Sequence, residues 1–223
     1  MLYDALWAAG VGLFLLLALW PTRSTGKRLL KSWRVQDPTS AQIEDAIRYL
    51  KRRRFLYPWI FVGLTFVPLG SGRGVGSFAA IVLGGTLLAE LIATQLHREG
   101  SQRVATLTPR GLFDIANQYV LISYAAIVAI GVVLLVVDLR IAQLPALVVS
   151  LGAVALVMWA AVARPADGDE VVDRALRTRS VHVSAGLGAA VVGALVGGGF
   201  GFFCVLAWVA MANTNYVAKR VFW

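Results

Sequence analysis

The chain has 223 residues, of which 58% are hydrophobic and only 15% are charged, and its mean hydropathy is +0.72. Soluble domains carry about 25% charged residues, so this composition excludes an ordinary soluble protein and indicates an integral membrane protein. The net charge of +9 would favour a nucleic-acid partner in a soluble protein. In a membrane protein, however, the Lys and Arg residues must first be assigned to the two sides of the membrane, because an excess on the cytoplasmic side is ordinary. We therefore predict no nucleic-acid partner.

Six stretches are long and apolar enough to cross about 30 Å of hydrocarbon. We predict an all-α, polytopic transmembrane bundle with spans near residues 2–20, 55–69, 75–96, 118–137, 144–163 and 182–212. The first ten residues hold no Lys or Arg, and no small-x-small cleavage site follows, so we expect a retained helix rather than a signal peptide. The second span is short, and Arg52, Arg53 and Arg54 before it are expected to extend to the lipid headgroups.

Lys and Arg residues are unevenly divided between the loops. Segments 21–54, 97–117 and 164–181 hold 17 of the 21, and the other side has Arg73, Arg140, Lys219 and Arg220. Cytoplasmic loops carry the excess of Lys and Arg. We therefore predict a multi-pass protein of the cell membrane in which these three segments are cytoplasmic and both termini lie outside.

Each cytoplasmic segment is predicted to hold a capped amphipathic helix. The start signals are a capping box at Thr39 and Gln42, Thr108 with Pro109 at the first helical position, and Asp167 with Glu170. An acid-x-Ala triplet also begins at Glu44, Asp114 and Asp173. These matches suggest a three-fold repeat of span, amphipathic helix and span over residues 1–70, 71–140 and 141–223. The alternative is that any cytoplasmic loop between spans forms a capped interfacial helix.

Small residues recur every four positions along the last predicted span. They are Ala185, Ala189, Gly193, Gly197 and Gly201. Such spacing lets helix backbones approach closely in membranes, so we predict that Gly193, Gly197 and Gly201 are helix-packing positions and that the span faces protein rather than lipid. Packing within one subunit is favoured over a seam between identical subunits.

Glu90 lies inside the third predicted span and is the first candidate for a functional residue. It precedes His97 by seven residues, which places it about 10 Å into the membrane at 1.5 Å per residue. Thr86, Glu90, Thr94 and His97 are spaced to form one polar stripe on a helix face. A carboxylate buried in a membrane is expensive, so it either pairs with a partner or takes up a proton.

Two hypotheses for Glu90 follow. In the first, it is the coupling acid of a proton- or cation-coupled site, or part of the polar lining of a cavity. In the second, which we favour, it is a structural acid held by Arg103 or Arg110 from the next cytoplasmic segment, or by Gln118.

Metal and catalytic motifs are absent from the sequence. The one cysteine, Cys204, and the two histidines, His97 and His182, do not have metal-ligand spacing, and both histidines are expected at the cytoplasmic edge. The glycine-rich run at 70–76 lacks the strand before it and the Gly-Lys-Ser/Thr ending of a phosphate loop, so it is interpreted as a turn. We predict no enzyme activity, no metal and no cofactor.

Three short motifs carry a resemblance. They are Arg103-x-Ala-x-Leu-x-Pro-Arg110, Ala89-Glu90-Leu91, and Arg164-Pro followed by Asp173-Arg-Ala-Leu-Arg177. Together they resemble small multi-spanning membrane proteins of actinobacteria, over roughly residues 85–185. The resemblance implies an integral membrane protein of the cell envelope with no known enzyme activity.

The sequence therefore predicts a non-catalytic integral membrane protein, an accessory or scaffold subunit. We expect its basic cytoplasmic helices to contact membrane lipid of anionic type, a protein partner or a second copy of the chain. The candidate contact is segment 21–54, which also holds Leu29, Leu30 and Trp33. The first alternative is a small-solute or ion transporter that uses Glu90, and an enzyme acting on lipid is a more distant one.

Overall fold

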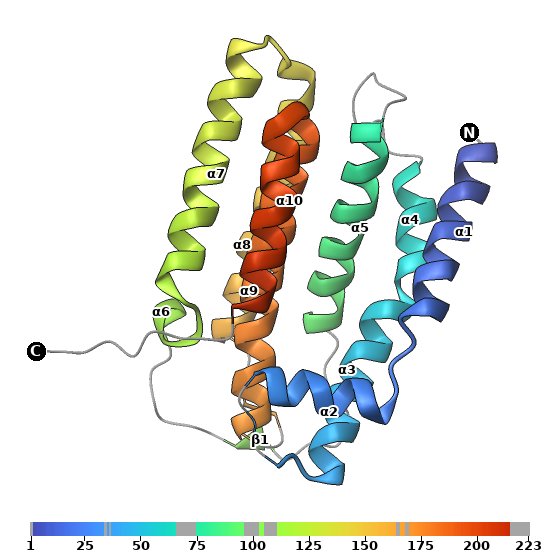
Figure 1. Cartoon of the computed structure of the whole chain (residues 1–223), viewed down its shortest axis with the longest axis vertical. Coiled ribbons are helices and arrows are strands. Elements are labelled where there is room, and N and C mark those ends of the chain that lie inside the picture. The colour runs from blue at the N-terminus through green and yellow to red at the C-terminus, as the bar shows by residue number, and fades with distance from the viewer. Residues whose placement is uncertain are drawn as a thin grey trace, which may run out of the picture.

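The computed structural model is a bundle of helices (Figure 1). It describes residues 2–33, 35, 37–65, 75–95, 103–104, 111–163, 166–167 and 170–214. The helices that run along the long axis are α1 (Leu2–Ala18), α4 (Tyr57–Thr65), α5 (Val75–Gln95), α7 (Gln118–Val137), α8 (Leu144–Ala163), α9 (Glu170–Val196) and α10 (Gly198–Asn213). The predicted all-α class is confirmed.

Most of the other elements lie at the lower end of Figure 1, which we call the basal end. They are α2 (Arg23–Ser32), α3 (Ser40–Phe55), α6 (Leu112–Ile115), and the two-residue strands β1 (Arg103–Val104) and β2 (Ala166–Asp167), which pair antiparallel. The 3₁₀ turn η1 (Ile141–Gln143) lies at the opposite end, between α7 and α8. The basal end therefore collects segments from all three predicted cytoplasmic regions.

Three of the described helices are long and apolar enough to cross a membrane: Gln118–Val137, Ile141–Ala163 and Val171–Val196. Shorter apolar stretches lie in α1, α5 and α10, at Ala9–Ala18, Val82–Ile92 and Gly198–Asn213. Among the residues that the structure describes, helix length and composition thus support only part of the six predicted spans.

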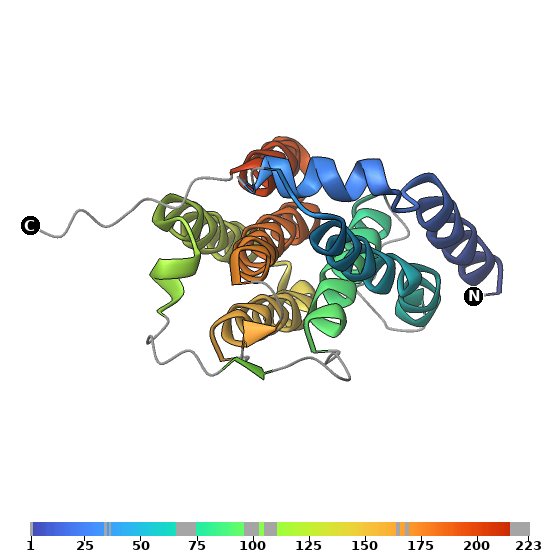
Figure 2. The ribbon, with the colours of Figure 1, turned by 90° about the horizontal axis from the view of Figure 1, so that it is seen from below.

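Helix α9 is the centre of the bundle. Viewed from below, it lies between α7, α8, α10 and α5 (Figure 2). Every residue from Ser180 to Gly193 is buried, whereas α7 has a largely exposed apolar surface that includes Ile130, Val133 and Val137. The prediction that the last span faces protein therefore holds for α9.

The prediction of one continuous last span is wrong, because the chain turns back at Gly197 and Gly198. Their φ angles are 78° and 60°, in the left-handed region that glycine adopts without steric strain. Arg140 holds the turn from the α7–α8 connection, since its Nη1 donates to the carbonyl of Val196 at 2.7 Å. The sequence shows a regular strip of small residues, but a four-residue spacing does not reveal that two of its glycines form a turn.

The glycine strip instead packs the two arms of the α9–α10 hairpin together. A Cβ at Gly201 would lie 2.8 Å from the carbonyl oxygen of Gly193, and a Cβ at Gly193 would lie 3.1 Å from the Cα of Gly201. In α9, Gly186 faces Trp208 of α10 with similar closeness. The hairpin returns the chain to the basal end at Thr214, so the N-terminal end of α1 and Thr214 lie at opposite ends of the bundle (Figure 1).

Helices α2 and α3 pack against the first turns of α9. Leu30, Ala46, Val172 and Ala175 are buried in one apolar cluster together with Val35. The apolar faces of α2 and α3 are thus covered by protein, unlike those of free interfacial helices. The predicted capping box is confirmed at the start of α3, where Thr39 accepts from the Gln42 amide and the Gln42 side chain accepts from the Thr39 amide.

The three segments of the proposed repeat take different forms. The first forms α3, the second forms the one-turn helix α6, and the third is continuous with the long helix α9. Thr108 and Pro109 lie outside the described residues, and the three-fold repeat stays a prediction.

The hairpin makes a testable prediction. Gly193→Ala should lower the free energy of unfolding by about 1–3 kcal/mol, because the added methyl group has no space between Gly201 and Cys204. Gly152→Ala is the matched control, since it lies in α8 with nothing within 4 Å of a new Cβ, and alanine favours the helix. Thermal unfolding in detergent measures both, and an unchanged midpoint for Gly193→Ala would contradict the close crossing.

Candidate functional site

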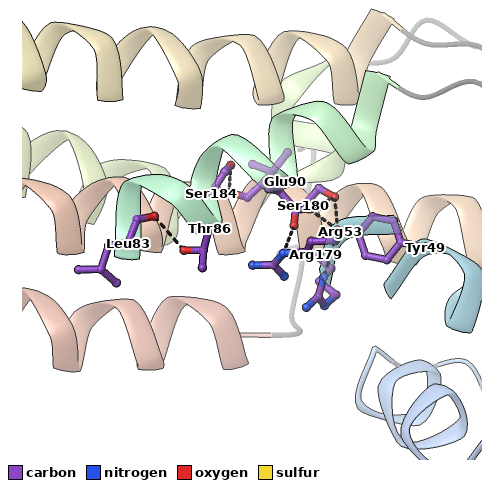
Figure 3. A network of polar contacts seen from close by, with 9 residues as sticks. Tyr49, Arg53, Leu83, Thr86, Glu90, Arg179, Ser180 and Ser184 are labelled. Atoms are coloured by element: carbon purple, nitrogen blue, oxygen red, sulfur yellow. Dashed lines mark hydrogen bonds and ion pairs between the residues drawn. The ribbon is translucent and has the colours of Figure 1, made fainter. Parts of the chain in front are cut away.

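Glu90 lies at the centre of a buried group of polar side chains where α3, α5 and α9 meet (Figure 3). Its side chain is 0% exposed. Helix α3 contributes Tyr49 and Arg53, and α9 contributes Arg179 and Ser180. We call these five residues the basal node.

Arg53 is the charge partner of Glu90. Its Nε lies 3.0 Å from Glu90 Oε2, and the two side chains are only 10% and 0% exposed. The two atoms are in ion-pair contact but are not aligned as a hydrogen bond, so the attraction is mainly electrostatic. Loss of either partner of such a buried pair should strongly destabilise the protein, because the remaining charge is then buried without compensation.

Two hydroxyl groups donate to the other carboxylate oxygen. Ser180 Oγ donates to Glu90 Oε1 at 2.6 Å, and the Tyr49 hydroxyl donates to the same oxygen. The two hydroxyl oxygens are 3.1 Å apart, but each has a single proton, and both protons are used on Glu90. Burial, followed by the nearby Glu90 charge, raises the pKa of Tyr49 to about 12, which keeps its hydroxyl a donor at neutral pH.

Arg179 completes the node from the side of Tyr49. Its Nη1 donates to the Tyr49 hydroxyl oxygen at 3.1 Å, and its guanidinium carbon lies 5.6 Å from the centre of the Tyr49 ring. Two guanidinium groups therefore surround one carboxylate, one in direct contact and one through Tyr49. This arrangement favours an ionised Glu90 and occupies both of its oxygens.

The predicted polar stripe on α5 does not form one site among the described side chains. Thr86 Oγ1 donates to the carbonyl of Leu83 in its own helix at 2.8 Å. The side chain of Thr94 and all of His97 lie outside the described residues. So do Arg110 and the side chain of Arg103, whose backbone is in β1, and these two suggested partners stay predictions.

Sequence reasoning missed Arg53 because Arg52, Arg53 and Arg54 were treated alike as headgroup contacts. Arg53 differs from its neighbours by its position on the helix. It shares one face of α3 with the buried residues Ala46 and Leu50, at the spacings of three, four and seven residues that define a helix face. That spacing was the available signal that Arg53 points into the protein.

A second buried polar contact surrounds His182, which is 0% exposed. The Asn117 amide donates to His182 Nε2 at 2.9 Å. Nδ1 must therefore carry the ring proton, and it lies 2.6 Å from the carbonyl oxygen of Thr214. The ring of Trp33 lies 5.6 Å from the imidazole, so one histidine joins the start of α7, the end of α10 and the end of α2.

The charged start of α9 is also partly buried. Arg177 donates to Asp173 at 2.7 Å and to the carbonyl of Ala161 in the last turn of α8 at 2.8 Å. The side chains of Arg177 and Asp173 are 2% and 5% exposed. These contacts fix α8 on α9 and make the basal end a region of structural ion pairs.

The described residues hold no group of three His, Cys, Asp or Glu side chains placed to bind a metal ion. Cys204 is buried against Gly193 in the hairpin, about 16 Å along α9 from His182 at 1.5 Å per residue. The hairpin halves the separation expected from one continuous helix, but the thiol and the imidazole still do not meet.

The ion pair makes a testable prediction. Arg53→Met and Glu90→Gln should each lower the free energy of unfolding by about 3–5 kcal/mol, because each leaves a buried partner uncompensated. The double variant should lose less than the sum of the two, and unfolding in mixed detergent micelles measures this coupling. Arg48→Met is the control, since Arg48 is an exposed cation of the same helix and should change little. Strictly additive losses would contradict the pairing.

Comparison of this chain with protein-family models, with curated proteins and with solved structures finds no match. The function is therefore inferred from the contacts and charges of the chain itself.

Proposed function

We propose that this chain is a non-catalytic integral membrane protein, an accessory or scaffold subunit that contacts a protein partner or anionic lipid through its basal end. The observation that carries the proposal is the division of the basal cations into two groups. Arg53, Arg177 and Arg179 are used inside the protein. A second set is exposed at the surface of α2 and α3: Arg23, Lys27, Arg28, Lys31, Arg48 and Lys51.

The distribution of charge supports a cytoplasmic basal end. Among the described Lys and Arg residues, only Arg140 lies at the opposite end of the bundle. Lys and Arg are enriched in cytoplasmic loops, so we place α2 and α3 in the cytoplasm and the start of α1 outside. Because α10 returns to the basal end, this placement puts Thr214 on the cytoplasmic side, in contrast to the C-terminus-out topology expected from six spans.

Helix lengths support a bundle that crosses the membrane. Helix α7 has 20 residues, or about 30 Å, the thickness of the hydrocarbon core. Helices α1, α5 and α10 run along the same long axis of the bundle as α7, α8 and α9 (Figure 1), and α10 contacts α9 through Gly201 and Trp208. We propose that these shorter apolar helices also cross the membrane, together with α4.

The transporter hypothesis is less well supported. A coupling acid must exchange its proton or ion with water during the cycle, whereas Glu90 is 0% exposed and ion-paired with Arg53. The hydroxyls of Ser180 and Tyr49 occupy its other oxygen. These contacts favour a structural acid over a coupling acid.

A flux measurement separates the two functions. We expect liposomes that contain the purified protein to conduct protons, Na⁺ and K⁺ no faster than protein-free liposomes, as followed by trapped pH- and cation-sensitive dyes. Substitution Glu90→Gln should leave this background unchanged. A gradient-driven flux that is present in the wild-type protein and absent in Glu90→Gln would contradict the scaffold proposal.

Photo-crosslinking in native membranes tests directly whether the basal end contacts a partner or lipid. A photoreactive residue at Arg48, which is exposed at the basal end, should give a discrete protein or lipid adduct. The matched position is Leu139, which is 80% exposed at the opposite end and should give none. Equal labelling from both positions would count against a contact specific to the basal end.

A further inference from the structure

We propose that the exposed side of α2 binds the phosphate headgroups of anionic phospholipids in the cytoplasmic leaflet. This side consists of Lys27, Arg28 and Lys31, which we call the α2 cationic face. The inference rests on the membrane placement of the proposed function and names the ligand of one part of the basal end.

The first support is the way in which α2 is fixed to the protein. Its other face is buried, with Leu30 in the cluster shared with α3 and α9. Gly26 is packed so closely that an added Cβ would lie 2.9 Å from the side chain of Ile47. Lys27, Arg28 and Lys31 are exposed, and their spacing of one, three and four residues places them on one side of the helix. The fold therefore holds the three cations outward in a fixed arrangement.

The second support is the depth of α2 in the membrane. His182 accepts from the amide of Asn117, directly before the span that begins at Gln118. The ring of Trp33, the C-cap of α2, lies 5.6 Å from the same imidazole. The end of α2 is thus at the level where the apolar span begins. Figures 1 and 2 show α2 lying across the bundle axis, so its whole length stays near that level.

The third support comes from the two tryptophans that bracket α2. Trp20 precedes the helix and is 48% exposed, and Trp33 follows it. Tryptophan is enriched at the membrane–water interface because its ring is apolar and its N–H is polar. Lys51 of α3 lies 5.6 Å from the centre of the Trp20 ring, which adds a cation at the same level. This combination is typical of a headgroup-contacting helix.

The fourth support is charge. No acid occurs between residues 21 and 33, and in the described part of the chain Lys27, Arg28 and Lys31 have no carboxylate partner. At the start of α2, Arg23 lies 3.7 Å from Glu44, but both side chains are largely exposed, so this pair is weak. Cations at headgroup depth meet lipid phosphates before they meet a soluble protein, which favours lipid as the ligand.

Binding of short-chain lipids to the full-length protein in a non-ionic detergent tests this assignment. We expect dioctanoyl phosphatidylglycerol to bind more tightly than dioctanoyl phosphatidylcholine, as measured by microscale thermophoresis. The triple variant Lys27→Gln, Arg28→Gln, Lys31→Gln should weaken binding of the anionic lipid at least tenfold, because each Lys or Arg near an anionic surface contributes about fivefold. The matched control Lys27→Arg, Arg28→Lys, Lys31→Arg keeps the charge and should bind like the wild-type protein.

Three results would overturn the inference. Equal affinity for the two lipids, or unchanged affinity in the neutralised variant, would leave the α2 cationic face to a protein partner. Inorganic phosphate that binds as tightly as the anionic lipid would make free phosphate the ligand instead. None of these results creates a Glu90-dependent flux, so they are distinguishable from failure of the scaffold proposal.

Discussion

The structure depends on the compensation of one carboxylate that is completely removed from water. An ionised Glu90 without partners would cost several kcal/mol in a dry environment, so its neighbours must be supplied by the fold. Arg53 and Tyr49 come from α3, and Ser180 comes from α9. Because these contacts are directional, they fix the rotation of α3 and α9 relative to α5. The same helix α5 contacts both α4 and the α8–α9 pair, so the basal node lies at the junction between the N-terminal and C-terminal parts of the bundle.

The second constraint is the close packing of α9 inside the bundle. In the membrane placement proposed above, hydrophobic burial would give little drive for association between helices, so their contact would depend on shape. Small residues provide that shape: Gly186 allows Trp208 to approach, and Gly193 and Gly201 allow the hairpin arms to touch. Polar contacts then occur at the two ends of α9. Arg140 binds the last carbonyl at one end, and the basal node fixes the other.

Helix class and most apolar helices could be predicted from the sequence, because long hydrophobic runs and the Thr39 capping signal are local properties. The hairpin could not, since a turn at Gly197 requires a positive φ that four-residue spacing does not encode. Glu90 was found because an acid in an apolar run is conspicuous. Its partner Arg53 was missed because hydropathy treats three consecutive arginines alike, whereas the fold separates them by helix face. The burial of His182 was missed for a related reason: its two partners come from α7 and α10, which only the tertiary structure brings together.

Infrared difference spectroscopy of the Glu90 carboxyl group tests the central claim most directly. The spectrum of the wild-type protein minus that of Glu90→Gln isolates this one group in detergent or in liposomes. If Glu90 is a structural ion paired with Arg53, the difference should show a carboxylate band that stays constant between about pH 5 and 8. A protonated carboxyl band that titrates within this range would show that Glu90 is accessible to protons, and it would contradict the structural account in favour of transport.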